Sequence, residues 1–212
     1  MAHVLVIASR RYNGHELWTA LGVMQNHGHT FEVVSTAHIL RDEITGNPAK
    51  IERLTHEVKS IEGFDGIMFI SGNMQDTEAT WYNEAALELV RQAEAKHLPI
   101  AAICCSVPAI REATNGKTVS YFPLVRSKQL LEGCGAVCST ISISADQNVV
   151  TAEHQMATQV WTETFCELLE GKEPTLHLED SGFTPGLREA KPDPDLERIK
   201  RISRNTGKVG LE

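Results

Sequence analysis

The residue best placed to do chemistry in this sequence is Cys104, which follows the short apolar run of residues 99–103. A run of that length opened by proline predicts a buried parallel strand, and Pro108 suits the first turn of a helix. Cys104 would then lie in a sharp turn at the end of the strand, where free amides and the helix dipole favour a thiolate. This arrangement is typical of a nucleophile elbow with cysteine in place of serine, although a cysteine simply buried in the core is the alternative.

The elements that must position this thiol follow from hydrophobic patterning. Apolar runs alternate with amphipathic segments through the first half of the chain, which predicts βαβ units and a doubly wound, mostly parallel sheet in an α/β fold. A long polar connection is expected over residues 36–49, with plain surface as its simplest interpretation. Strands are predicted at residues 3–8, 31–35, 67–70 and 98–103, and helices at residues 16–26, 51–58, 79–96 and 107–114.

Three loops are expected to meet at one edge of this sheet. In doubly wound sheets, ligands bind beyond the carboxyl ends of the strands. Glu16, Gly72 and Cys104 each follow such an end. A glycine there indicates a close backbone approach or a positive φ. The sequence therefore predicts a functional site that contains all three residues.

The second half of the chain is less regular. We expect residues 1–170 to form the α/β domain and residues 171–212 to form an irregular C-terminal extension, in which residues 192–202 could be helical. Short strands are predicted at residues 118–121, 136–143 and 149–152, followed by a helix at residues 160–169.

Composition narrows the classes of function and location. The net charge of −8 and the lack of a basic stripe argue against nucleic acid as a partner. No apolar run reaches 18 residues and no secretory signal is visible, so we expect no membrane association. Five cysteines without an export signal indicate reduced thiols in the cytoplasm. Cys134 and Cys138 lack a second ligand pair, so we expect no metal and no cofactor.

The residues at these positions together resemble the ThiJ/PfpI superfamily. The resemblance rests on the run of residues 4–7, Glu16 on the first helix, Gly72 after the third strand and the elbow of residues 101–104. This superfamily includes Parkinson disease protein 7, PfpI-type proteins regarded as proteases, and glyoxalase III or deglycase-like enzymes. The resemblance implies a flavodoxin-like three-layer sandwich with a glutamine-amidotransferase-like topology that usually forms dimers.

The same resemblance assigns roles to individual residues. Cys104 would be the reactive cysteine, and the carboxyl group of Glu16 would donate a hydrogen bond to its thiolate. The amides of Gly72 and Cys105 would stabilise an oxyanion.

Several positions depart from the family pattern. Cys105 stands where PfpI-type members carry a histidine, Phe122 stands where others carry a histidine before proline, and Ser71 replaces a glycine. No base is therefore matched by motif, and His15 and His154 are accessory candidates only, since each is also explained as a surface histidine.

Two functional hypotheses from different classes follow. The first is an enzyme of glyoxalase III or deglycase type that acts on small electrophilic carbonyls, with Cys104 as nucleophile and Glu16 as acid and base. The second is a stress-response protein without turnover, whose Cys104 is oxidised and resolved by Cys105. A peptidase, amidase or amidotransferase fits less well, and a binding module stays open. The partners expected are a small-molecule substrate and a second copy of the chain.

Overall fold

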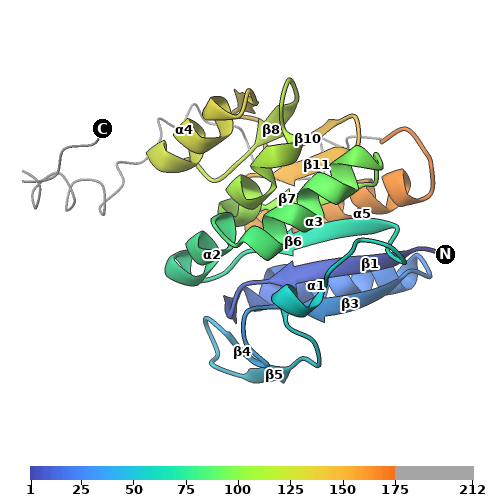
Figure 1. Cartoon of the computed structure of the whole chain (residues 1–212), viewed down its shortest axis with the longest axis vertical. Helices are drawn as coiled ribbons and strands as arrows, with labels where there is room; N and C mark the ends of the chain where they lie inside the picture. Colours follow the sequence, from blue (N-terminus) through green and yellow to red (C-terminus); the bar gives the residue numbers. More distant parts are fainter. Residues whose placement is uncertain (175–212) are drawn as a thin grey trace, which may run out of the picture.

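The computed structural model of the chain describes residues 1–174, and its centre is a six-stranded sheet in the order β10-β11-β7-β6-β1-β3 (Figure 1). Five strands run parallel, and β10 adds to the edge in the antiparallel direction. The predicted mostly parallel, doubly wound α/β sheet is confirmed. The strands are β1 (His3–Ala8), β3 (Thr30–Val34), β6 (Gly66–Ile70), β7 (Ile100–Ile103), β10 (Ile143–Asp146) and β11 (Val149–Ala152).

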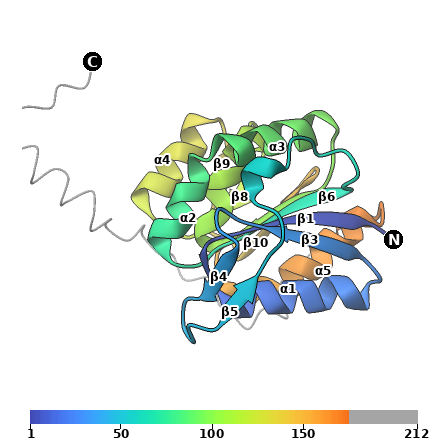
Figure 2. The same cartoon turned by 60° about the horizontal axis from the view of Figure 1, so that its bottom comes forward.

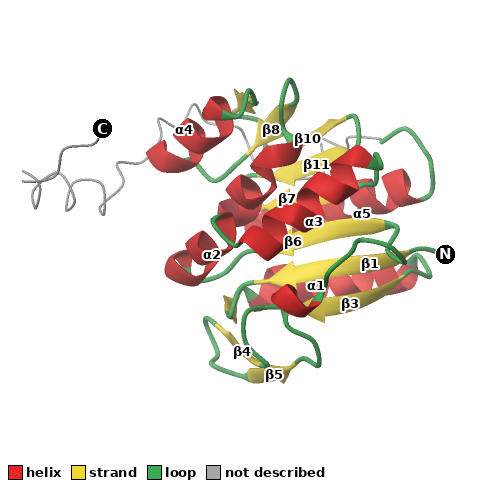
Figure 3. Ribbon diagram, viewed as in Figure 1, coloured by secondary structure: helices red, strands yellow, loops and turns green. Residues whose placement is uncertain are grey.

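Helices cover both faces of the sheet and complete three layers (Figures 2 and 3). Successive strand side chains point to opposite faces, so Val4 and Val6 of β1 join one core, whereas Leu5 and Ile7 join the other. The first core is shared with α1 (Gly14–Asn26) and α5 (Thr158–Leu169). The second is shared with α3 (Glu84–Ala95) and the 3-10 helix η2 (Cys104–Ala113). Apolar side chains on both strand faces are what a sheet covered on both sides requires.

The strand register brings the loops of the predicted site to one edge. Ala8 pairs with Ile70, Phe69 pairs with Ala102, and Ala152 pairs with Ile103. Because these strands are parallel, the segments that follow β1, β6, β7 and β11 all emerge at their shared carboxyl edge.

Four predicted segments differ from the structure. Residues 36–49 are not a plain connection, because β4 (Ile39–Asp42) and β5 (Pro48–Lys50) form a small sheet with β2 (Arg11–Tyr12). Residues 51–58 contain only the 3-10 turn η1 (Thr55–Glu57) instead of a helix.

The helix predicted over residues 79–96 is divided into α2 (Met74–Trp81) and α3. The break occurs because the side chain of Asn83 accepts a hydrogen bond from the amide of Ala86 at 3.1 Å and caps the second helix. The helix predicted over residues 107–114 begins earlier, at Cys104, and has 3-10 geometry.

The remaining described elements complete the second half of the chain. Among residues 1–174, no helix is both long and apolar enough to cross a membrane. Of the extension predicted for residues 171–212, residues 175–212 lie outside the described residues, as does the helix considered for residues 192–202. The remaining elements of the second half of the chain are β8 (Thr118–Ser120), α4 (Val125–Gly133), β9 (Val137–Ser139) and the 3-10 turn η3 (Gln155–Ala157).

Candidate functional site

Cys104 occupies a strained position where β7 ends and η2 begins. Its φ is +56°, a conformation that non-glycine residues seldom adopt. Ser106 supports the turn, because its hydroxyl accepts a hydrogen bond from the amide of Ile103 at 3.1 Å. The indole of Trp81 donates to the carbonyl of Cys105 at 2.8 Å. The backbone is thus held at the elbow that the sequence predicted, and the side chain of Cys104 is partly exposed.

Glu16 is fully buried on the first turn of α1 and accepts hydrogen bonds from Ser71 at the end of β6. The amide of Ser71 lies 2.9 Å from one carboxyl oxygen, and the hydroxyl lies 2.7 and 2.8 Å from the two oxygens. Burial raises the pKa of Glu16 to about 8, the bonds from Ser71 oppose this change, and the charge of Glu43 adds to it. The carboxyl group is therefore mostly protonated at pH 7.

Ser71 also connects this acid to the thiol. The neighbouring Cys105 thiol, whose sulfur lies 3.7 Å from that of Cys104, raises the pKa of Cys104 well above its usual range. Burial and Glu16 raise that pKa further, whereas a hydrogen bond from Ser71 lowers it. This direction is opposite to the low pKa expected from the helix dipole, because desolvation and the adjacent thiol outweigh the amides.

A glycine is required at position 72 because the backbone of Arg11 lies very close to it. A close backbone approach was one of the two explanations predicted from the sequence. A Cβ there would lie 1.9 Å from the carbonyl oxygen of Arg11. Two hydrogen bonds fix the contact, from the Asn13 amide to the Ser71 carbonyl at 2.9 Å and from the Asn73 amide to the Arg11 carbonyl at 2.8 Å. The amide of Gly72 lies between these two hydrogen bonds in the chain and takes part in neither of them.

The accessory histidines occupy different surroundings. His15 lies on the first turn of α1 with its side chain exposed. His154 is half-buried, and its Nδ1 accepts a hydrogen bond from the Met156 amide at 3.3 Å, which caps η3. The geometry thus holds Glu16 on Ser71, and both act on the pKa of Cys104, while His154 caps a local turn.

The sequence interpretation missed two residues that organise the site. Ser71 was noted only as a departure from glycine, although a hydroxyl at a strand end was the available signal. Asn13 accepts a hydrogen bond from the Glu16 amide at 3.2 Å and donates to the side chain of Gln155. Asn13 therefore caps α1 and links it to η3, a contact between distant segments that spacing does not reveal.

The fold and the elbow define a flavodoxin-like α/β protein with a cysteine after a central strand. The family model described as the DJ-1/PfpI family matches residues 2–168. The chain belongs to this family, and the resemblance found in the sequence is confirmed.

Similar proteins support the same fold. An uncharacterised protein of Methanocaldococcus jannaschii is 26% identical over 152 residues, which cover 71% of this chain and 73% of that protein. A ThiJ/PfpI domain protein from Brachyspira murdochii superimposes with a TM-score of 0.71 at 17% identity, covering 80% of this chain and 96% of that one. Drosophila melanogaster DJ-1beta gives a TM-score of 0.69 at 16% identity, with 99% of each chain covered.

Proposed function

We propose that this protein is a cofactor-independent enzyme that acts on small electrophilic carbonyl compounds, such as α-oxoaldehydes, through Cys104 and Glu16. The observation that carries the proposal is a buried acid, Glu16, held by Ser71 beside the partly exposed Cys104 at the elbow, and burial raises the pKa of this acid to about 8. A group with a pKa near neutrality can both take and return a proton during one reaction.

The first step would be addition of the Cys104 sulfur to the aldehyde carbon, which forms a hemithioacetal. The thiol proton passes to the ionised fraction of Glu16 and then to the carbonyl oxygen. The amides of Gly72 and Cys105 are our proposed donors to the oxyanion that develops there.

The second step would be a proton shift within the hemithioacetal. Glu16 removes the hydrogen from the former aldehyde carbon and returns a proton to the neighbouring carbon, while the hydroxyl proton of the hemithioacetal moves to the neighbouring carbonyl oxygen, so that a hydroxyacyl thioester is formed. Water then hydrolyses the thioester, releasing a 2-hydroxy acid and the thiol. No external oxidant or reductant is required, because one carbon is oxidised as its neighbour is reduced.

The test is formation of lactate from methylglyoxal by the purified protein. We expect lactate from the wild type and none above the uncatalysed rate from Cys104→Ala or Glu16→Gln. Cys138→Ser is a matched control, because it removes a half-buried thiol on β9. The proposal fails if Cys104→Ala forms lactate as fast as the wild type.

A second candidate is a peroxide-sensing protein without turnover. The observation that favours it is the 3.7 Å separation of the Cys104 and Cys105 sulfurs. Peroxide would oxidise Cys104 to a sulfenic acid, and attack by Cys105 would release water and form a disulfide. Mass spectrometry after one equivalent of peroxide tests this, since loss of two hydrogens confined to the peptide with both residues is expected.

We also propose a homodimer in the cytoplasm as the working form. Trp18 on α1 is 54% exposed and Ile44 after β4 is 76% exposed, and both flank the pairing of Tyr12 with Asp42. Exposed apolar side chains that lie near one another suit a protein interface. Light scattering should give twice the chain mass for the wild type and a smaller mass for Trp18→Glu; a wild-type monomer contradicts the proposal.

A further inference from the structure

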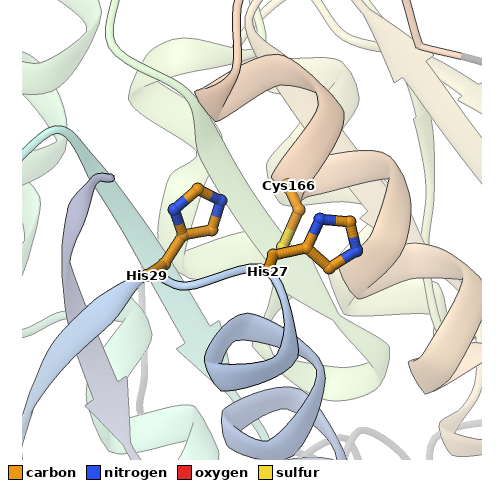
Figure 4. Close-up of side chains that lie close together, drawn as sticks. All are labelled: His27, His29 and Cys166. Atoms are coloured by element: carbon orange, nitrogen blue, oxygen red, sulfur yellow. The ribbon is translucent and has the colours of Figure 1, made fainter.

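Three potential metal ligands lie together far from Cys104, where the end of α1 meets the end of α5. Figure 4 shows Cys166 projecting from α5 toward the imidazoles of His27 and His29, which flank the turn into β3. Within the described residues, one nitrogen from each histidine and the Cys166 sulfur all lie within 4.8 Å of one another. Glu170 caps α5 beside them and adds a carboxylate.

The spacing around Glu170 suits one small ion. Its Oε1 lies 3.0 Å from His27 Nδ1 and 3.7 Å from His29 Nε2. A tetrahedral zinc ion with bonds of about 2.0–2.3 Å keeps nitrogen and oxygen ligands about 3.3 Å apart and nitrogen and sulfur about 3.6 Å apart. The carboxylate and imidazole atoms are near this separation, and the sulfur, which lies within 4.8 Å of a nitrogen of each imidazole, must move closer to bind the same ion.

One buried atom in this cluster has no partner. His29 is 5% exposed, and its Nε2 is without a hydrogen-bond partner, although it is directed toward Glu170. A buried polar group left unpaired is costly, so such an atom calls for an explanation. The opposite nitrogen is used, because it accepts a hydrogen bond from the Ala2 amide at 3.2 Å.

We propose that His27, His29, Cys166 and Glu170 form a structural zinc site that fastens the end of α1 to the end of α5. A thiolate and a carboxylate supply the two negative charges that the ion requires, both imidazoles stay neutral, and Lys172, which is ion-paired with Glu170, must release that carboxylate. Soft sulfur with imidazole nitrogen favours zinc over magnesium or calcium. Four protein ligands would close the coordination sphere, which is typical of structural sites.

Binding requires two proton movements. Cys166 is buried, and its thiol proton would leave to solvent when the sulfur binds the metal. The Nε2 hydrogen of His29 would be replaced by the metal, so the neutral ring would carry its hydrogen on Nδ1. The hydrogen bond that the Ala2 amide donates to Nδ1 must then break. This change of tautomer would not occur if the cluster bound no metal.

The sequence predicted no metal, because Cys134 and Cys138 lack partners and the true neighbours are far apart in the chain. His27 and His29 are two residues apart, but Cys166 and Glu170 join them only through the packing of α5 against α1. Only the fold brings this ligand set together.

The test uses protein carrying Cys104→Ser, so that the reactive thiol cannot hold the metal. Zinc titrated calorimetrically should bind at one ion per chain with release of one proton, and cobalt should give a sulfur-to-cobalt absorption band. Cys166→Ser should remove the band. His27→Gln, at a side chain that is 31% exposed, should weaken zinc binding by about 100-fold or more while the fold is kept.

Cys134→Ser is the matched control and should bind as tightly as the parent. Nitrogen chemical shifts of His29 should move to the Nδ1–H tautomer when zinc is added. The proposal is overturned if zinc does not bind at micromolar concentration, or if binding is unchanged in both Cys166→Ser and His27→Gln.

Discussion

Replacing Glu16 by glutamine should change how the stability of the protein depends on pH. The carboxyl group has a pKa of about 8 in the folded protein, against an ordinary value of 4.5, because it is buried. A group whose pKa is raised by folding is protonated in the native state, and its contribution is lost as the pH rises toward 8. Between these two values the free energy of unfolding should fall by about 1.4 kcal/mol per pH unit.

The magnitude is large enough to measure by urea unfolding. From pH 5.5 to pH 7.5, Glu16 alone should lower the free energy of unfolding by about 2–3 kcal/mol. With a slope of about 2–3 kcal/mol per molar urea, the midpoint should fall by about 1 M. The glutamine side chain resembles the protonated acid, so Glu16→Gln should lack this decline.

The difference between the two proteins isolates the contribution of Glu16, because other titrating groups contribute to both. Glu62→Gln, at an acid on the exposed surface, is the control and should follow the wild-type profile. Equal pH slopes for the wild type and Glu16→Gln would refute the conclusion that this buried acid is protonated at neutral pH. If the wild type instead gained stability relative to the variant as the pH rises, the pKa of Glu16 would be lowered by folding and not raised.

Three further predictions concern the neighbours of the thiol. Gly72→Ala should lower the free energy of unfolding by about 3 kcal/mol or more, since its Cβ would overlap the Arg11 carbonyl; an unchanged urea midpoint would contradict this. Ser71→Ala removes a donor that lowers the pKa of both Glu16 and Cys104, so iodoacetamide labelling of Cys104 should shift to higher pH; a shift to lower pH would be inconsistent. Trp81→Phe loses the hydrogen bond to the Cys105 carbonyl, so thermal unfolding should show a free energy of unfolding lower by about 1 kcal/mol; an unchanged value would contradict this.

The sheet and the elbow could be predicted from the sequence because both depend on local signals. Apolar runs such as residues 4–7 mark strands buried on both faces, and the turn after residue 103 follows from a strand that meets a helix signal. The split between α2 and α3 was missed because a continuous amphipathic pattern conceals the cap at Asn83. The small sheet of β2, β4 and β5 was missed because such short strands carry too little pattern.

The charge state of the site could not be predicted, since it depends on several groups that only the fold brings together. The dipole argument considered Cys104 and its own helix, whereas Cys105, Ser71 and Glu16 also act on the sulfur. Two acidic groups that interact in a buried site cannot both ionise without a large penalty, so a charge on one raises the pKa of the other. The protonated Glu16 found at neutral pH removes one of the repulsions that oppose a thiolate. Proton exchange between these two groups, rather than a permanently ionised sulfur, is therefore the chemistry that this geometry favours.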